Sequence, residues 1–419
     1  MLPSHVVTAA RRFRTADVRR VGRRTRRPGE RTARERGAVL VHAAVAMTGL
    51  LAFSALTIDL GTVWVARAQA QNAVDAAALA GAVSLAYVDP SNLDAAVASA
   101  RAIGQTHAIW GDPIAPGLMT VTAGSCPAGA PSITGSCLNV AVERGGAAGA
   151  PLPVFFSRIF GGTPTRMRAS ASAKVMLGNS STCVRPFAIP DRWTETSGPW
   201  TFDSIFERYQ PGSPGALVPN PDSYDPPGPG GTGTGHDRTE LMNQEIQIVR
   251  GPIDVPVVRG RTMYSLDLPR TGGDGLTVRE RYEENVVSCA GEPVSIGQTV
   301  YTAYSHQEWT QDSVNVLFDR DAGARWDGTK IVDSAFTVSP RIVPIVLYDP
   351  DEFSQRLPSP AEEYRAPMIV RNIVGLFITE RVDGGTITGI VVPLPGAFDQ
   401  RSTLLTQDAS FLHSVALVR

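Results

Sequence analysis

The longest apolar run of the chain lies near its N-terminus. From Gly37 to Ile58 there are 22 consecutive residues without a formally charged side chain. At 1.5 Å per residue, a helix of this length spans about 33 Å, which matches a hydrocarbon core of about 30 Å. The pattern therefore predicts one transmembrane helix over residues 37–58. A buried soluble helix and a cleaved signal peptide are the alternatives, but the run is about twice as long as the apolar region of a signal peptide.

Residues 59–110 continue the helical pattern beyond this run. The segment from Asp59 to Val88 contains no proline and is rich in alanine, the best helix former. We therefore expect the first helix to extend to about Val88, where Asp89-Pro90 would end it. A second helix is expected over residues 91–110, so that residues 59–110 form a helical stalk.

The expected stalk helix has two different faces. One carries Arg67, Gln71 and Asp75 at a spacing of four residues. The other is a stripe of small and aliphatic side chains, namely Ala70, Val74, Ala77, Gly81, Leu85 and Val88. Small residues permit the close approach of another element. The stripe packs either on the outer domain of this chain or on a second subunit.

After residue 110 the apolar positions change from helical spacing to alternation. The expected elements are short strands at 119–123 and 137–142, one or two helical turns at 153–161, and a half-buried strand at 166–177. Residues 111–210 are therefore expected to form an α+β outer region.

A segment rich in proline and glycine follows. Residues 211–236 contain seven Pro and seven Gly in 26 positions, which is typical of a flexible loop. Beyond it, residues 237–419 are expected to be mainly β. The expected strands are Ile246–Val249, Val255–Val258, Thr299–Tyr304, Val314–Phe318, Ile342–Tyr348, Met368–Thr379 and Thr386–Val392. The predicted fold class is α+β, with a single N-terminal transmembrane helix, an Ala-rich helical stalk and a β-rich outer domain.

Charge is divided unevenly along the chain. Residues 1–36 contain twelve Arg and three acidic residues, a net charge of +9, whereas the rest of the chain carries −10. The apolar run that directly follows this basic tail favours a membrane over a nucleic-acid partner. By the positive-inside rule, residues 1–36 are a cytoplasmic tail and the residues beyond about 60 lie outside. We therefore expect a single-pass protein of the cytoplasmic (inner) membrane, in contact with the lipid bilayer.

The sequence offers little catalytic chemistry. It has no Gly-x-Ser-x-Gly, His-Glu-x-x-His or Gly-x-x-x-x-Gly-Lys motif, and its six histidines are scattered. Asp319 to Asp327 faintly resembles a calcium loop, but Ala324 and Lys330 stand where an EF-hand requires Gly and Glu. We expect no enzyme activity, no cofactor and no metal.

Four cysteines lie on the expected outer side, where two disulfides are favoured over four reduced thiols. Cys126 and Cys137 flank a segment rich in Pro and Gly that reverses the direction of the chain, so these two cysteines are expected to pair. Cys183 and Cys289 remain as the second pair. That disulfide would tie the two flanks of residues 211–236 into one domain.

A series of residues around the first helix carries a family resemblance. The residues are Arg36, Gly37, Asp59, Gly61, Arg67, Gln71, Asp75, Leu79 and Gly81. This pattern resembles the N-terminal domain of TadG-like Tad (Flp, type IVb) pilus-assembly proteins. The resemblance implies a noncatalytic envelope component that helps to build or anchor Flp pili through contacts with other pilus-assembly or envelope proteins. Oligomerisation is compatible with it.

Two departures from related patterns keep alternatives open. Pilins are cut after a Gly and carry Glu at the fifth mature residue, whereas the fifth residue after Gly37 is His42. The metal motif of a von Willebrand type domain, which many TadG proteins carry, is also absent. The alternatives are a minor pilin or pseudopilin that enters the fibre, and a membrane-tethered adhesin or envelope enzyme.

Overall fold

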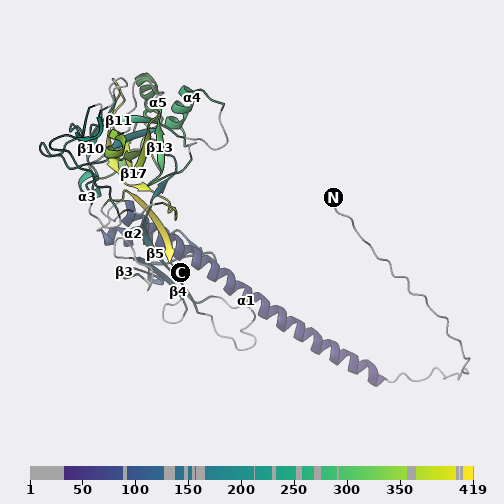
Figure 1. Ribbon diagram of the computed structural model, residues 1–419. Coiled ribbons are helices and arrows are strands. Elements are labelled where there is room, and N and C mark those ends of the chain that lie inside the picture. The colour runs from purple at the N-terminus through teal and green to yellow at the C-terminus, as the bar shows by residue number, and fades with distance from the viewer. Residues whose placement is uncertain are drawn as a thin grey trace, which may run out of the picture.

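The computed structural model describes most of the chain beyond residue 32. The described residues are 33–87, 92–126, 137–145, 150–152, 156, 166–211, 213–228, 233–251, 257–268, 275–289, 292–355, 365–402, 405 and 409–418. They form a long N-terminal helix, a small sheet packed on its outer half and a larger β-rich head (Figure 1). This arrangement confirms the α+β class expected from the sequence.

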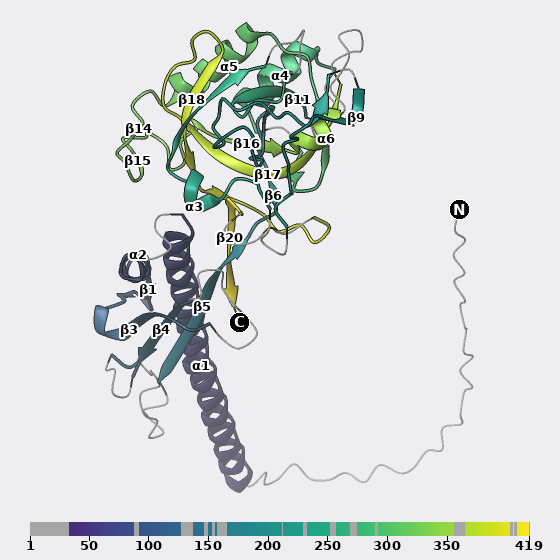
Figure 2. The ribbon, with the colours of Figure 1, turned by 60° about the vertical axis from the view of Figure 1, so that its left-hand side comes forward.

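The first helix, α1 (Ala33–Tyr87), has 55 residues and contains both the apolar run and the Ala-rich segment. It ends close to Val88, the end expected from the sequence. Helix α2 (Leu93–Gln105) follows, and the side chain of Asn92 caps it by accepting a hydrogen bond from the amide of Ala95. α2 packs against the outer end of α1 (Figure 2).

A five-stranded sheet covers the outer half of α1. Its order is β19 (Leu394–Pro395), β20 (Leu412–Val418), β5 (Met167–Leu177), β4 (Cys137–Arg144) and β3 (Met119–Gly124). We call α2, this sheet and the outer half of α1 the stalk unit. β20 pairs antiparallel with β5, and Figure 2 shows these two strands leading to and from the head. The head, which is residues 178–411 apart from β19, is therefore inserted between two adjacent strands of the stalk sheet.

The core of the stalk unit is built on the small residues of α1. The side chains buried there are Ala66, Ala70, Ala73, Val74, Ala77, Ala78, Ala82, Leu85 and Ala86. They pack against α2 and against the inner face of the sheet, including Leu138, Val140 and Ala169. The small-residue stripe is thus occupied by this chain's own outer part.

Seven strands form the main sheet of the head. In order they are β10 (Glu245–Arg250), β18 (Thr386–Val392), β17 (Pro367–Ile378), β13 (Thr299–Thr302), β11 (Thr262–Asp267), β7 (Phe187–Pro190) and β16 (Ile342–Tyr348). The end strand β10 also pairs with β11, and the other end strand, β16, also pairs with β17. Because both end strands are paired in this way, the sheet closes into a barrel. Helices α4 (Val278–Val287) and α5 (Gln307–Arg320) add buried side chains to the same core.

Short elements complete the described fold. They are β1 (Ala108–Ile109), β2 (Asp112–Pro113), η1 (Pro116–Leu118), β6 (Ser180–Ser181), β8 (Tyr209–Gln210), β9 (Ser213–Leu217), α3 (Arg238–Leu241), β12 (Val294–Ser295), β14 (Arg325–Trp326), β15 (Ile331–Val332) and α6 (Pro350–Gln355).

One expected strand is a helix. The segment Val314–Phe318 lies within α5, so the β prediction for it was wrong. The buried residues of α5 are Thr310, Ser313, Val314 and Leu317, a spacing of three and four that places them on one helical face. The β-branched residues of the segment favour a strand, but the helical period of the buried positions prevails. Two other expected elements are described only in part: residues 153–155 and 157–161 of the first, and 255–256 of the second, lie outside the described residues.

The described part of residues 211–236 also differs from the expected flexible loop. It contains β9 and the buried residues Asp222, Tyr224 and His236. The carboxylate of Asp222 accepts hydrogen bonds from the backbone amides of Thr196 (2.9 Å) and Glu207 (2.7 Å). Polar side chains thus hold this Pro/Gly-rich segment on the head, where its composition alone gave no sign of an ordered packing partner.

Candidate functional site

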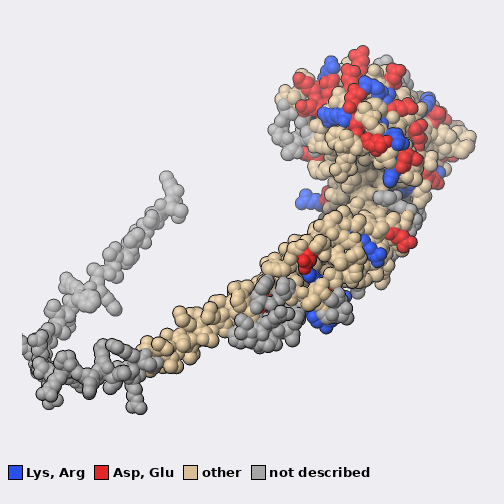
Figure 3. All heavy atoms as spheres, turned by 180° about the vertical axis from the view of Figure 1, so that it is seen from behind, with Lys and Arg blue, Asp and Glu red and all other residues tan. Residues whose placement is uncertain are grey.

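The inner half of α1 exposes an unbroken apolar surface. Its large apolar side chains from Val39 to Val65 are between 47% and 76% exposed, apart from Val63, which is half-buried against the stalk core. Figure 3 shows this rod without acidic or basic side chains along its free part, while charged side chains gather on the head. In the described part of the chain, α1 is the one helix long and apolar enough to cross a membrane. Such a surface is costly in water and suits a hydrocarbon environment.

Asp59 marks the outer end of this surface. Its side chain is buried, although its neighbours along the helix are exposed. The backbone amide of Phe156 approaches both carboxylate oxygens, at 3.2 and 3.3 Å. A hydrogen-bonded carboxylate is tolerated beside lipid far better than a bare one. Gly61 lies two residues further along the helix in open space, and Trp64 is 76% exposed, as in an interfacial aromatic belt.

The polar face of the stalk helix joins it to the sheet. The side-chain amide of Gln71 donates to a carboxylate oxygen of Asp75 (2.8 Å) and to the carbonyl oxygen of Ser170 in β5 (3.2 Å). Arg67 is exposed. The structure therefore brings Gln71 into contact with the sheet and with Asp75, and leaves Arg67 on the surface.

Gly81 lies where three elements meet. A Cβ at this position would lie 2.8 Å from Leu138 Cγ in β4 and 3.0 Å from the carbonyl oxygen of Ala96 in α2. Only glycine therefore fits without a shift of its neighbours. Leu79 is half-buried against the same core. Of the remaining motif residues, Arg36 and Gly37 lie near the start of α1.

The outer end of α1 is tied to the C-terminal strand. The hydroxyl of Tyr87 donates to the carbonyl oxygen of His413 (2.6 Å), and His413 Nδ1 donates to the carbonyl oxygen of Ala86 (2.9 Å). Burial lowers the pKa of His413 to about 4, so its ring is neutral. Sequence reasoning missed this pair, because the two residues are 326 positions apart and no local pattern links them.

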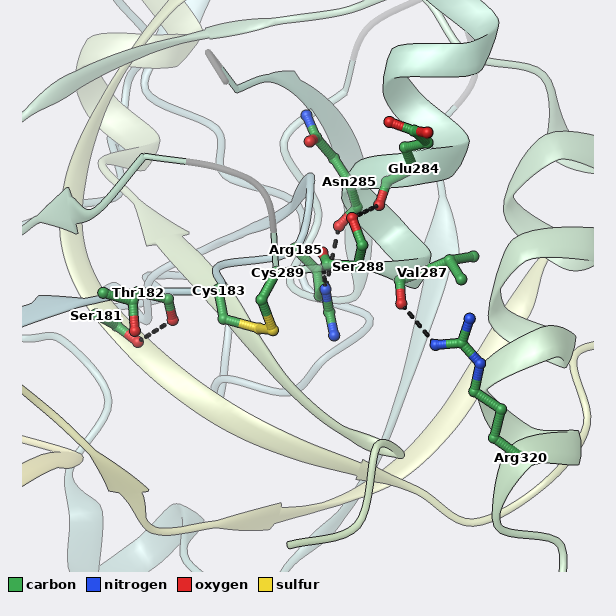
Figure 4. Close-up of a disulfide and its surroundings, with 10 residues drawn as sticks. All are labelled: Ser181, Thr182, Cys183, Arg185, Glu284, Asn285, Val287, Ser288, Cys289 and Arg320. Atoms are coloured by element: carbon green, nitrogen blue, oxygen red, sulfur yellow. Dashed lines mark hydrogen bonds between the residues drawn. A yellow bond between two sulfur atoms is a disulfide. The ribbon is translucent and has the colours of Figure 1, made fainter. Parts of the chain in front are cut away.

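Two disulfides brace the outer part. Cys126 is joined to Cys137, which closes the end of β3 on the start of β4. Cys183 is joined to Cys289 across 106 positions, linking the segment after β6 to the end of α4 (Figure 4). This bond brackets residues 211–236 and keeps both of their flanks in the head.

The C-terminal end of α4 beside this disulfide is capped by guanidinium groups. Arg185 donates to the carbonyl oxygens of Ser288 and Asn285, and Arg320 donates to that of Val287 (2.9 Å), as Figure 4 shows for Ser288 and Val287. Cations in this position complement the helix dipole. Burial and the nearby Arg320 lower the pKa of Arg185 to about 10.

The aspartates of the segment that faintly resembles a calcium loop contact other protein groups. Asp319 forms an ion pair with Arg381, and Asp321 accepts hydrogen bonds from Ser334 and Ala335. Asp327 accepts from the amides of Thr329 and Lys330, both at 2.8 Å. Within the part of the chain that the structure describes, no three His, Cys, Asp or Glu side chains gather as metal ligands.

Comparison with known families bears on the N-terminal segment. Residues 37–84 match the family model described as putative Flp pilus-assembly TadE/G-like. The match lies wholly within α1 and spans the apolar surface, Asp59, the Gln71–Asp75 contact and Gly81. Comparison with curated proteins and with solved structures gives no match. The expected resemblance is thereby confirmed over residues 37–84, which are similar to the Tad domain of TadE/G-like proteins.

Proposed function

We propose that this protein is a noncatalytic, membrane-anchored component of Flp/Tad pilus assembly that acts outside the cytoplasm through contacts with other envelope proteins. The proposal rests on the difference between the two halves of the Tad domain along α1. Its inner half exposes apolar side chains, whereas its outer half is buried under the stalk sheet. One continuous helix thus serves as membrane anchor and as core of the domain that presents the head.

Charge supports the orientation of the proposal. The N-terminal 36 residues carry a net charge of +9, which favours retention of this end in the cytoplasm. The two disulfides lie beyond the apolar surface, on the side that this orientation exposes to an oxidising compartment. The head and the stalk unit would then lie outside the cytoplasmic membrane.

Topology can be tested with two reporters fused after Arg419. A phosphatase that folds only outside the cytoplasm should be active, and a fluorescent protein that matures only in the cytoplasm should be dark. After extraction with alkaline carbonate, the chain should remain in the membrane fraction. A bright cytoplasmic reporter would refute the orientation, and release by carbonate would refute the anchor.

The role in pilus assembly is tested in the native bacterium. Deletion of the gene should remove surface Flp pili while the level of the major pilin stays unchanged. The wild-type gene should restore them, and a variant with Leu51→Arg in the apolar surface should not. Normal piliation of the deletion strain would contradict the proposal.

The minor pilin alternative makes a different prediction about the N-terminus. An anchor should be recovered from membranes with its Arg-rich tail intact, because His42 replaces the Glu expected of a processed pilin. A fibre subunit should instead be found in sheared pili and begin at Ala38. N-terminal sequencing of both fractions separates the two functions.

A further inference from the structure

The stalk sheet is built from a basic stretch of an otherwise acidic body. Residues 113–184 contain five basic residues and a single acidic one, Glu143. This stretch holds strands β3, β4 and β5 of the stalk sheet. The height of its charges above the apolar surface of α1 decides what they can contact.

Two contacts show that β5 runs along α1 toward the head. Near the start of the strand, the carbonyl oxygen of Ser170 accepts a hydrogen bond from Gln71. At its end, Leu177 pairs with His413, and Tyr87 donates to the carbonyl oxygen of His413. The helix rises about 24 Å from Gln71 to Tyr87, and the strand rises about 23 Å from Ser170 to Leu177. The two elements therefore advance together, as Figure 2 shows.

Arg67 and Arg168 lie at one height, just below the contact of Gln71 with Ser170. Arg67 comes four residues before Gln71, about 6 Å along the helix. Arg168 comes two residues before Ser170, about 7 Å along the strand. Both arginines are exposed. Because Asp59 is buried, Arg67 is the first exposed charged residue of α1 beyond the apolar run.

Two further arginines at this end of the stalk unit are neutralised by carboxylates. Arg166 forms an ion pair with Glu143 (3.2 Å), and Arg144 forms one with Asp112 (2.8 Å). Both pairs lie where β4 ends beside the start of β5. Among the described residues, the side chains of Arg67 and Arg168 have no such partner. This end of the stalk unit therefore presents two uncompensated positive charges.

The height of these charges matches the surface of a bilayer. Arg67 is nine residues beyond Ile58, the end of the uncharged run, which is about 14 Å along the helix. Lipid headgroups extend about 5–8 Å beyond the hydrocarbon core. Long side chains lean toward the N-terminus of their helix, here toward the membrane, and the remaining distance is comparable to the length of an arginine side chain. A guanidinium fork matches the oxygen atoms of a phosphate group.

We infer that Arg67 and Arg168 form a binding surface for anionic phospholipid headgroups on the outer face of the membrane. The inference rests on the membrane anchor of the proposed function and adds the class of lipid that surrounds it. A lipid is favoured over an acidic protein, because headgroups already surround α1 at this height and a protein would have to displace them. Headgroups bound to both elements fix the depth of α1 and the orientation of the stalk sheet.

The test measures which phospholipid lies beside Trp64 in the full-length protein reconstituted into vesicles. Brominated acyl chains quench tryptophan fluorescence only at short range, so Trp64 reports its neighbouring lipids. One set of phosphatidylcholine vesicles carries the bromine on phosphatidylglycerol, and the other carries it on phosphatidylcholine at the same molar fraction. The two degrees of quenching give the relative binding constant of the two lipids. Trp64→Phe should lose the quenching, which identifies the reporter.

The wild type should bind phosphatidylglycerol about two- to fivefold more strongly than phosphatidylcholine at low salt. High salt should reduce this preference, because ions screen exposed charges. The double variant with Arg67→Gln and Arg168→Gln should bind both lipids about equally, whereas Arg67→Lys with Arg168→Lys should keep most of the preference. Arg101→Gln, at an exposed site on α2, is the matched control and should keep the wild-type ratio.

The possible failures are distinguishable. Equal binding of the two lipids by the wild type would overturn the inference and favour an acidic protein as partner, while quenching by both lipids would still support the anchor. A preference that persists in the glutamine variant would also overturn it. If neither lipid quenched Trp64, the helix would lie outside the bilayer, and the proposed anchor would fail together with this surface. The salt dependence of the wild type tests the inference even if the glutamine variant fails to reconstitute.

Discussion

Tyr87 at the end of α1 donates its hydroxyl proton to the backbone carbonyl of His413 in β20. This contact closes the chain on itself, because the head lies between the two residues in sequence. His413 donates a hydrogen bond to the carbonyl oxygen of Ala86, so two hydrogen bonds join the last turn of the helix to the strand. Helix α1 is therefore joined directly to the strand that leaves the head.

The Tyr87 contact gives the first prediction. Tyr87→Phe should lower the free energy of unfolding by about 1 kcal/mol, because it removes one hydrogen bond and keeps the ring. Thermal unfolding of the full-length chain in detergent measures this loss. Tyr301→Phe is the control, since that ring is 40% exposed on the head. Equal melting temperatures for the two variants would contradict the role assigned to Tyr87.

A second prediction concerns the apolar surface. Leu51 is 72% exposed near the middle of the run from Gly37 to Ile58. Leu51→Arg should cost about 2.5–3.5 kcal/mol of insertion free energy and reduce the fraction of protein held in membranes. Val338→Arg, at an exposed site on the head, should fractionate as the wild type. Full membrane retention of the Leu51 variant would argue against a single spanning helix.

The two motif glycines should respond in opposite ways. Gly81→Ala should destabilise the stalk unit, because overpacking typically costs about 1–3 kcal/mol and the gain in helix propensity offsets only about 1 of this. Gly61→Ala should be neutral or slightly stabilising, since nothing lies within 4 Å of the added Cβ. Thermal unfolding of both variants tests the difference. A Gly81 variant as stable as the Gly61 variant would show that α2 and β4 do not pack as tightly as described.

Stability should fall on acidification between about pH 6.5 and 4. The pKa of His413 is lowered to about 4 and that of His236 to about 3, so the unfolded chain binds protons there that the folded chain does not. Burial raises the pKa of Asp191 to about 6, so this group alone would make the folded state more stable as the pH falls. The two histidines outweigh this single carboxyl group. Urea midpoints at pH 7.5, 6.5, 5.5 and 4.5 measure the slope.

His413→Asn should flatten this dependence on pH, because it removes one of the two buried imidazoles. His306→Asn should leave it unchanged, since His306 is exposed. If both variants kept the wild-type slope, the loss of stability in acid would have to come from groups other than His413.

The disulfides yield the last prediction. Non-reducing peptide mapping should recover Cys126 joined to Cys137 and Cys183 joined to Cys289, and any other pairing or free thiols would refute it. In the chain-entropy model, a disulfide that closes a loop of about 15 residues stabilises the folded state by about 3 kcal/mol, and one that closes a loop of about 100 residues stabilises it by about 4.7 kcal/mol. Replacing Cys183 and Cys289 together by Ser should therefore lower the melting temperature more than replacing the other pair.

The sequence alone was sufficient for features that depend on neighbouring residues. The length of the apolar run predicted the exposed half of α1, and the alternation of residues 166–177 predicted β5. These succeed because helical and strand periods are local properties of the chain. Gln71 and Gly81 were placed in the same way on two faces of one helix, whereas Asp59 was singled out by the family resemblance.

Their partners were decided by tertiary structure. Phe156, Ser170 and Leu138 meet those three residues from segments that no local period connects to α1. For the same reason composition misjudged residues 211–236, where Asp222 accepts amide hydrogen bonds from distant positions.

The insertion of the head is the largest feature that only the tertiary structure reveals. It depends on β20 pairing with β5 and on the contact of His413 with Tyr87, whose residues are separated by more than 200 positions. Pairing of this kind is selected by the shape and burial of the whole fold, because many strands share the same alternating pattern. The sequence therefore determined which segments are helix and strand over most of the stalk, and the fold determined which of them meet.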